Sequence, residues 1–368
     1  MMDQNLLKSE EQAVFALRAL YRQHGYLPYK MSKFEEYEYY IRNKDFLVSD
    51  RIITFTDTSG RLLALKPDVT LSIIKNAADL PGVKHRVCYN ESIYRISEST
   101  GQFKEIMQTG LECIGDVDLY DIYETVSLAS RSLAMICPDF ILQISHMGIL
   151  SALLDAACPD AAFRQEALEC IGSKNAHDLR RLCRNYGVAE ETAVLLEAIP
   201  GLSGSRQEVL DRLADLCGSR IRQPLDQLKA LSALLETREE SDRIIFDFSV
   251  VNNMNYYSGI VFRGFLSGIS EGVLAGGQYD KLMEKLGRRS GAIGFAIYLN
   301  LLEQLPAPAA DFDVDTLLIY GSPSELQQAA ALADRLIRDG KSVSVQKSIP
   351  PKLRYRQLLR VSEEVNPC

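Results

Sequence analysis

The stretch YRISESTGQFKEIMQTGLECIG, residues 94–115, decides how the rest of the chain is interpreted. It predicts a loop at Gly101, followed by a strand whose successive side chains point to opposite faces of a sheet. One face of this strand is apolar enough for a protein core and carries Met107, Thr109, Leu111 and Cys113. The other face is mixed and carries Ile106, Gln108, Gly110, Glu112 and Ile114.

The mixed face has two interpretations. A solvated sheet surface would tolerate it, as it would Glu91 and Arg95, which share a face of the preceding strand. A solvated face, however, seldom combines a lone amide and a lone carboxylate with isoleucines and a glycine. Gly110 removes a side chain between Gln108 and Glu112, which would leave a floor for a small polar ligand. The pattern alone leaves both interpretations open.

The composition is that of an ordinary globular protein. The chain has 368 residues, 46% of them hydrophobic and 24% charged, which suits two or three cooperating units. No stretch is apolar enough to span a membrane, and MMDQNLLKSEEQ at the N-terminus lacks the layout of a signal peptide. We therefore expect a cytoplasmic protein without a membrane partner. The net charge of −8 argues against extensive nucleic-acid binding.

Common metal and cofactor motifs are missing from the sequence. None of the eight cysteines forms a CxxC pair, and only four histidines are available, so we expect no metal site. There is no P-loop, GxGxxG or HExxH, and no cofactor is expected. GISEG, residues 268–272, fits the nucleophile elbow of α/β-hydrolases, but no histidine follows His177, so we regard the match as chance.

The order of the predicted elements indicates an α+β protein with a mainly antiparallel sheet flanked by helices. Helices are expected from residue 9, from Asp68 and at 119–136, 279–287 and 294–305, and strands within 51–65, 84–96, 105–115, 140–146 and 242–277. We divide the chain into a core at 1–305, with a helical insertion at about 161–240, a linker at 306–311, and a C-terminal α/β unit at 312–368. That unit predicts a single strand–helix–strand crossover followed by a basic ending.

Four segments in order resemble the motifs of class II aminoacyl-tRNA synthetases, in the form found in histidyl-tRNA synthetases and their paralogues. The stretch GQFKEIMQTGLECIG resembles motif 2, with Gln102 in place of the first basic residue. LALKPDVT resembles the LRPE/D-x-T element, and GAIGFAIYLNLLEQL stands in the place of motif 3. NNMNYYSGIVFRGF and VLAGGQYDKLMEKLG resemble the two histidine-specific motifs. Together they cover most of residues 1–305.

The resemblance implies a histidine site and the residues that form it. Asp68 and Thr70 would contact the amino acid, and Gln108 and Glu112 would receive its α-ammonium group. Tyr257 and Tyr279 would wall the imidazole, and Gly276 and Gly277 would let the ligand approach the backbone. The mixed face of the strand would then be the floor of this site.

The same resemblance implies that the chemistry of a synthetase has been lost. Of the arginines that stabilise the reacting phosphate in the family, only the motif 2 arginine is kept, as Arg95, a residual nucleotide-site residue. Asn300-Leu301 stands where motif 3 has Glu-Arg, Asn252 stands at the position of the histidine-specific arginine, and Lys66 replaces the arginine of LRPE/D. The C-terminal unit is shorter than the anticodon-binding domain of these enzymes. We therefore expect no catalytic residues and no tRNA partner.

Paralogues of this kind serve as the regulatory subunit of short-form ATP phosphoribosyltransferase, the first enzyme of histidine biosynthesis. The resemblance therefore implies a noncatalytic subunit that binds histidine for feedback control. Its partners would be the short-form catalytic subunit and a second copy of itself, in a homodimer within a hetero-oligomer. A divergent histidine–tRNA ligase and a free-standing histidine sensor are the alternatives.

Overall fold

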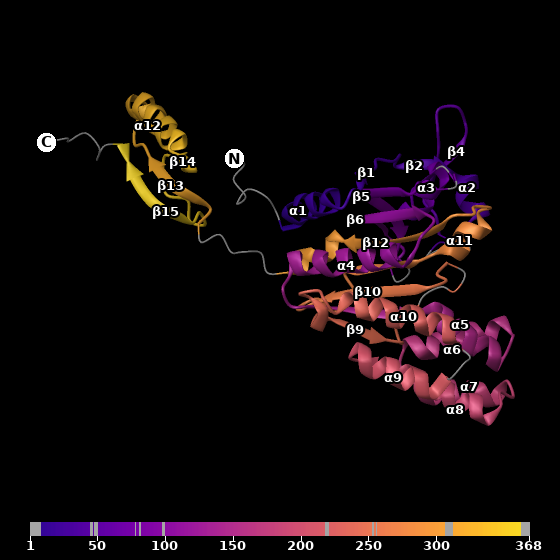
Figure 1. Ribbon diagram of the computed structural model, residues 1–368. Helices are drawn as coiled ribbons and strands as arrows, with labels where there is room; N and C mark the ends of the chain where they lie inside the picture. Colours follow the sequence, from indigo (N-terminus) through magenta and orange to yellow (C-terminus); the bar gives the residue numbers. More distant parts are fainter. Residues whose placement is uncertain are drawn as a thin grey trace. The chain divides into compact units, whose positions relative to one another are not determined.

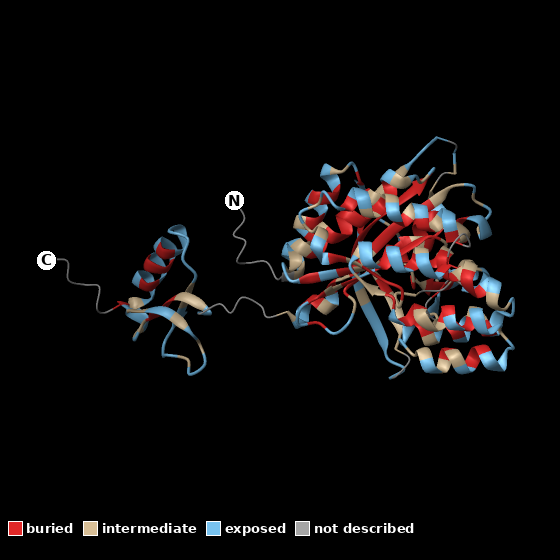
Figure 2. Ribbon diagram, turned by 60° about the horizontal axis from the view of Figure 1, so that its bottom comes forward, coloured by how far each residue is buried: buried red, intermediate tan, exposed pale blue. Residues whose placement is uncertain are grey.

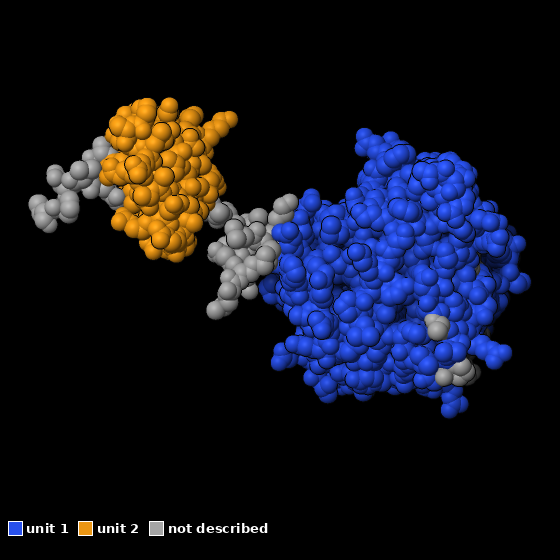
Figure 3. All heavy atoms as spheres, turned by 90° about the horizontal axis from the view of Figure 1, so that it is seen from above, with its two compact units in different colours: residues 1–305 blue, residues 306–368 orange. Residues whose placement is uncertain are grey.

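The computed structural model describes residues 9–44, 47, 51–77, 79–80, 82–97, 100–217, 221–251, 254, 256–305 and 312–361. The chain forms two compact units, residues 1–305 and 306–368, which are coloured separately in Figure 3. The linker expected at 306–311 lies outside the described residues. Each unit is described below by itself.

The first unit is built on a nine-stranded sheet (Figure 1). In spatial order its strands are β1 (Leu27–Pro28), β5 (His85–Ile96), β6 (Phe103–Gly115), β12 (Gly291–Tyr298), β11 (Leu274–Gln278), β10 (Ile260–Leu266), β7 (Phe140–His146), β9 (Ile244–Asp247) and β8 (Ser203–Gly204). Only the pairs β1–β5 and β7–β9 are parallel, and the other neighbours are antiparallel. The expected antiparallel sheet flanked by helices is confirmed.

The two faces of β6 belong to different hydrophobic clusters, as its alternation predicts. Leu111 and Cys113 pack in the larger cluster together with α1 (Ser9–Gln23) and α4 (Leu119–Ile136). Ile114 packs on the opposite face with α3 (Val69–Asn76) and α11 (Asp280–Lys285). Figure 2 shows the buried residues concentrated along the sheet and on the inner sides of the helices around it. The polar side chains of β6 therefore lie between two apolar layers.

The helix predicted at 294–305 is wrong for its first half. Residues Gly291–Tyr298 form β12, which pairs with β6 on one side and β11 on the other, and only Leu299–Gln304 form a short 3₁₀ helix, η6. The segment is almost continuously apolar because both of its faces are covered, and such a run does not distinguish a central strand from a buried helix.

A small second sheet and helix α3 lie beside the large sheet. Strands β2 (Phe34–Glu36), β4 (Leu62–Leu65) and β3 (Thr54–Thr56) pair antiparallel, next to α2 (Tyr37–Arg42), and the predicted turn at DTSG joins β3 to β4. Helix α3 begins directly after Asp68, whose side chain accepts a hydrogen bond from the backbone N–H of Leu71. Capping by Asp68 satisfies one of the free N–H groups at the helix start.

The region between residues 161 and 240 is helical, apart from β8, in the part of the chain that the structure describes. Following α5 (Met147–Ala157), it contains α6 (Ala161–Gly172), α7 (Ala176–Asn185), α8 (Glu190–Ala198), η3 (Ile199–Gly201), α9 (Arg206–Cys217) and α10 (Arg222–Leu235), with η5 (Ser241–Arg243) leading into β9. Its buried leucines belong to the same cluster as the sheet. The insertion therefore shares one core with the rest of the unit.

The second unit has a third strand that the sequence does not predict. Strand β13 (Val314–Ile319), η7 (Pro323–Glu325), α12 (Leu326–Arg338) and β14 (Val343–Gln346) form the expected crossover. The basic ending then contributes β15 (Tyr355–Arg360), which pairs parallel with the other edge of β13. Polar side chains dominate β15, so pairing with β13, and not a local pattern, makes it a strand.

Candidate functional site

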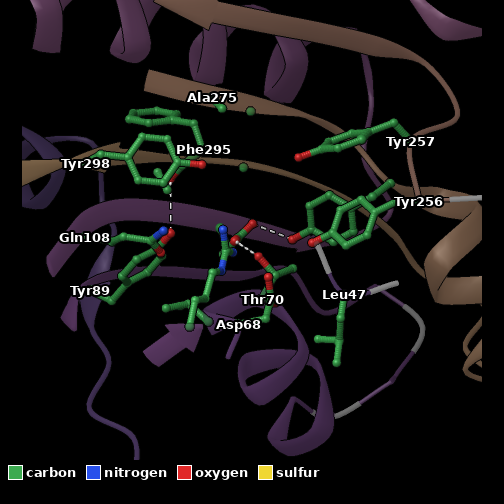
Figure 4. Close-up of a pocket in the computed structure, with 17 residues that line it drawn as sticks. Leu47, Asp68, Thr70, Tyr89, Gln108, Tyr256, Tyr257, Ala275, Phe295 and Tyr298 are labelled. Carbon is green, nitrogen blue, oxygen red and sulfur yellow. Dashed lines mark hydrogen bonds between the residues drawn. The ribbon is translucent and has the colours of Figure 1, made fainter. Parts of the chain in front are cut away.

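A cavity of about 330 Å³ opens on the face of the large sheet that carries the polar side chains of β6 (Figure 4). Its walls come from β5, β6, β11 and β12, from the start of α3, and from the tyrosines that precede β10. A volume of this size lies at the lower end of the range of about 300–1,000 Å³ that is typical of small-molecule sites.

Seven of the eight residues expected to bind histidine line this cavity, and they are Asp68, Thr70, Gln108, Glu112, Tyr257, Gly276 and Tyr279. Arg95 lines it as well. Gly277 does not: a β-carbon there would lie 2.8 Å from the ring of Tyr257, so this glycine makes room for the tyrosine and not for a ligand. The structure thus brings together side chains that are up to 211 residues apart in sequence.

Glu112 is the most deeply buried acid of the cavity. Its Oε1 accepts a hydrogen bond of 2.7 Å from Thr70 Oγ1, and its Oε2 accepts one from the hydroxyl of Tyr279. Burial raises the pKa of Glu112 to about 8, because the loss of solvent outweighs both donors, and the charge of Asp68 adds to the rise. The carboxyl group is therefore mostly protonated at neutral pH until a cation arrives beside it.

Asp68 and Arg95 place opposite charges on the cavity wall. Loss of solvent raises the pKa of Asp68, while the backbone N–H of Leu71 and the charge of Arg95 oppose this rise. The guanidinium of Arg95 donates from Nε to the carbonyl of Pro67 at 3.3 Å, which holds it beside the start of α3. Two acids and one guanidinium in a small cavity complement a zwitterionic ligand that carries an additional nitrogen base.

Tyrosines form much of the remaining wall. The ring centroids of Tyr256 and Tyr257 are 4.6 Å apart, and those of Tyr256 and Tyr279 are 5.7 Å apart. The sequence did not point to Tyr256, Tyr89 or Tyr298 as site residues. Two of them could have been found from the sequence. Tyr89 lies on the same strand face as Arg95, and Tyr256 is next to Tyr257 in the chain. For Tyr298 the wrong helix assignment hid the alternation.

Gly110 does not provide the expected open floor. A β-carbon at this position would lie 2.0 Å from the carbonyl oxygen of Phe295 and 2.8 Å from the hydroxyl of Tyr89. That hydroxyl donates to the same carbonyl at 3.3 Å. The space beside Gly110 is therefore filled by the protein itself, and the free volume lies nearer to Gln108 and Glu112.

The described positions where the sequence lacks the expected arginines do not line the cavity. Lys66 is completely buried and its Nζ lies 2.9 Å from Glu91 Oε2, whereas Leu301 packs against the larger hydrophobic cluster and Asn300 is exposed. Asn252 lies outside the described residues. Arg95 is the only arginine or lysine among the described residues that line the cavity.

The described residues lack both a metal-binding cluster and a membrane-spanning helix. They contain no group of three or more His, Cys, Asp or Glu side chains placed to hold a metal ion. None of their helices combines the length and the apolar character needed to cross a membrane.

The sheet, the flanking helices and the polar cavity on the sheet define a class II aminoacyl-tRNA synthetase-like protein. The family model described as histidyl-tRNA synthetase matches residues 3–302, and the chain belongs to this family. It resembles an ATP phosphoribosyltransferase regulatory subunit from Oceanobacillus iheyensis, with 31% identity over 88% of this chain and 81% of the relative.

Two solved structures share the fold. A protein of Bacillus halodurans, described as an ATP phosphoribosyltransferase regulatory subunit/histidyl-tRNA synthetase, superposes with a TM-score of 0.79, at 22% identity, over 96% of this chain and 93% of that one. A chain of the ATP phosphoribosyl transferase (HisG:HisZ) complex from Thermotoga maritima superposes with a TM-score of 0.62, at 19% identity, over 78% of this chain and 96% of that one.

Proposed function

We propose that this protein is a noncatalytic regulatory subunit of a short-form ATP phosphoribosyltransferase, and that it binds histidine in the cavity for feedback control. One observation supports the proposal most strongly. The residues suited to hold an amino acid converge on one cavity, while the described positions at which the family has further catalytic arginines, Lys66 and Leu301, do not line it. The names of the curated relatives support the same role.

Histidine would bind in the cavity with its cationic nitrogen and its α-carboxylate held by different residues. A cationic nitrogen would lie against Glu112 and Asp68, where it replaces the proton of the Glu112 carboxyl. The α-carboxylate would face Arg95, the single lining guanidinium of the described residues. The rings of Tyr257 and Tyr279 would flank the imidazole, and Gln108 would supply an amide hydrogen bond.

Feedback control requires a partner and two states of the assembly. Histidine can shift the activity of a catalytic subunit only if it binds the active and the inhibited assembly with different affinity. The Thermotoga maritima complex with a similar fold supports a short-form catalytic subunit as the partner. A homodimer of this chain within that assembly completes the proposal.

The alternative is a divergent histidine–tRNA ligase, which the family match by itself would favour. Activation of an amino acid by ATP builds negative charge on phosphorus, and loss of one preorganised donor typically costs on the order of 100-fold or more in rate. Only Arg95 is available for that task among the described lining residues. The arrangement therefore favours regulation over ligation.

The test is the phosphoribosyltransferase rate of the short catalytic subunit from the same organism. It is measured alone, with this protein, and with this protein plus histidine. We expect the protein to change the rate and histidine to inhibit only when the protein is present. If correctly folded protein changes nothing in any mixture, the regulatory role is wrong, and formation of histidyl-tRNA becomes the next assay.

A further inference from the structure

Strand β12 presents side chains of increasing size to the cavity. Its cavity-facing residues are Gly294, Ala296 and Tyr298, and all three line the cavity. In the register of the sheet, Gly294 pairs with Glu112 and Tyr298 pairs with Gln108. The side chains that β12 contributes to the wall therefore become larger from the Glu112 end of the cavity to the Gln108 end.

The two ends of the cavity differ in the space they offer. At one end, the carboxylate of Glu112 occupies the position that a β-carbon on residue 294 would fill. At the other end, the half-buried ring of Tyr298 stands over Gln108. Figure 4 shows Tyr298 and Gln108 together, at the side away from Tyr256, Tyr257 and Thr70. A ligand anchored at Glu112 thus meets Tyr298 at its far end.

The strand register places Arg95 on the same side as Tyr298. Along the β5–β6 pair, Val87 is opposite Glu112, Glu91 is opposite Gln108, and Arg95 is opposite Lys104. The Cα of Arg95 therefore lies beyond that of Gln108 on the path that leads away from Glu112. The charge of its guanidinium acts on Tyr298, where it opposes the rise in the pKa of the phenol that burial causes. A zwitterion that spans the cavity would therefore have its cationic end at Glu112 and its carboxylate at the end that Tyr298 limits.

We propose that Tyr298 limits the site to amino acids whose carboxyl group is free or carries only a small substituent, and that it excludes ligands with a bulky extension at that group. This inference rests on the proposed function and names the ligand class that the site accepts. Amides with bulky substituents, esters and acyl phosphates require space beyond the carboxylate, and the phenol ring occupies it. A bulky side chain that clashes with the wrong ligand is one way in which a binding site achieves specificity.

The experiment is calorimetric titration of the full-length protein with three ligands. Histidine tests the site itself, and histidinamide and histidine benzylamide carry the same neutral group at the former carboxylate but differ in bulk. Both amides lack the carboxylate charge, so a difference in affinity between them reports the effect of bulk alone. Tyr298→Ala removes the wall, Tyr298→Phe keeps the ring, and Tyr120→Ala, at an exposed tyrosine of α4, is the matched control.

We expect the benzylamide to bind at least about 10-fold more weakly than histidinamide to the wild type, since even one extra methylene in a filled pocket can cost this much. Tyr298→Ala should remove the difference, whereas Tyr298→Phe and Tyr120→Ala should keep it. Equal affinity of the two amides for the wild type, or a difference that persists in Tyr298→Ala, overturns the inference alone. Failure of the wild type to bind histidine overturns the proposed function and this inference with it.

Discussion

Glu112 and Gly294 face each other on neighbouring strands, and the carboxylate of Glu112 occupies the volume that a side chain at position 294 would need. A β-carbon on residue 294 would lie 1.8 Å from Glu112 Oε2, far closer than any real contact. Both the acid and the backbone carbonyl oxygen of Leu111, which would lie 2.5 Å from that β-carbon, therefore require a glycine here. The acid is held in position by its hydrogen bonds from Thr70 and Tyr279. The acid, its glycine and its two donors act as one unit.

Gly294→Ala should remove ligand binding and also lower the Tm, because a β-carbon at position 294 would lie 2.5 Å from the backbone carbonyl oxygen of Leu111 as well as against Glu112. The new methyl group displaces the Glu112 carboxylate and breaks its two hydrogen bonds, at a cost of about 1–3 kcal/mol for each buried group that is left unpaired. Calorimetry with histidine and thermal unfolding measure the two effects. Gly201→Ala is the control, because a β-carbon there has no neighbour within 4 Å, and it should change neither. Unaltered histidine affinity in Gly294→Ala would contradict a role for Glu112.

Histidine binding should release a proton near neutral pH. Burial raises the pKa of Glu112 from its ordinary 4.5 to about 8, and a ligand cation favours the ionised form, so affinity should rise with pH up to about 8. Titration at pH 7 in buffers of different ionisation enthalpy counts the released protons, and we expect close to one. Glu112→Gln should abolish the release, whereas the exposed Glu303→Gln should not. No buffer dependence in the wild type would refute the mechanism.

Glu112 should also make the stability of the folded protein depend on pH, and its raised pKa fixes the direction of this dependence. Because the pKa of Glu112 is higher in the folded than in the unfolded chain, the folded state binds more protons between about 4.5 and 8. The contribution of Glu112 to the free energy of unfolding is thus complete below pH 4.5 and is lost as the pH rises to 8. Chemical denaturation of the wild type and Glu112→Gln across this range isolates it. A Glu112 contribution that grows with pH would contradict the assignment.

Thr70→Val and Tyr279→Phe should each weaken histidine binding without unfolding the protein. Each removes one donor to Glu112, and hydrogen bonds to charged groups are worth about 1.5–3 kcal/mol, or roughly 10- to 150-fold in affinity. Calorimetry measures the loss. Tyr94→Phe removes a similar hydroxyl from a largely exposed Tyr94–Glu105 pair and should have no effect. Equal behaviour of all three variants would show that the two donors do not serve the ligand.

Asp68 has a structural and a ligand-binding role that two substitutions separate. Asn caps a helix about as well as Asp, so Asp68→Asn should keep the stability of α3 but lose the charge that faces the ligand. Asp68→Ala should lose both, with a stability cost of about 1 kcal/mol. Asp160→Ala, at the N-cap of α6, should lose stability only. Thermal unfolding and calorimetry distinguish these outcomes, and full histidine affinity in Asp68→Asn would remove Asp68 from the site.

The sequence correctly indicated that β6 carries polar residues on one face, because the side-chain alternation of a strand is a local property. Gln108 and Glu112 could therefore be selected as site residues, and the resemblance of neighbouring segments added Asp68, Thr70, Tyr257, Gly276 and Tyr279, all of which line the same cavity. The cap at Asp68 and the hairpin between β3 and β4 were also predictable, since both depend on residues a few positions apart.

Local sequence patterns establish which side chains can face a ligand, but contacts between distant segments set how much space those side chains leave. Position 294 must be glycine because Glu112, 182 residues earlier in the chain, and the neighbouring Leu111 carbonyl fill that volume, and Gly110 is closed off by Tyr89 and Phe295. Strands β12 and β15 exist because they pair with distant strands, and no local pattern distinguishes them from a helix or a loop. Alternation acts between neighbours in sequence, whereas the volume of a cavity depends on contacts made only when the chain has folded.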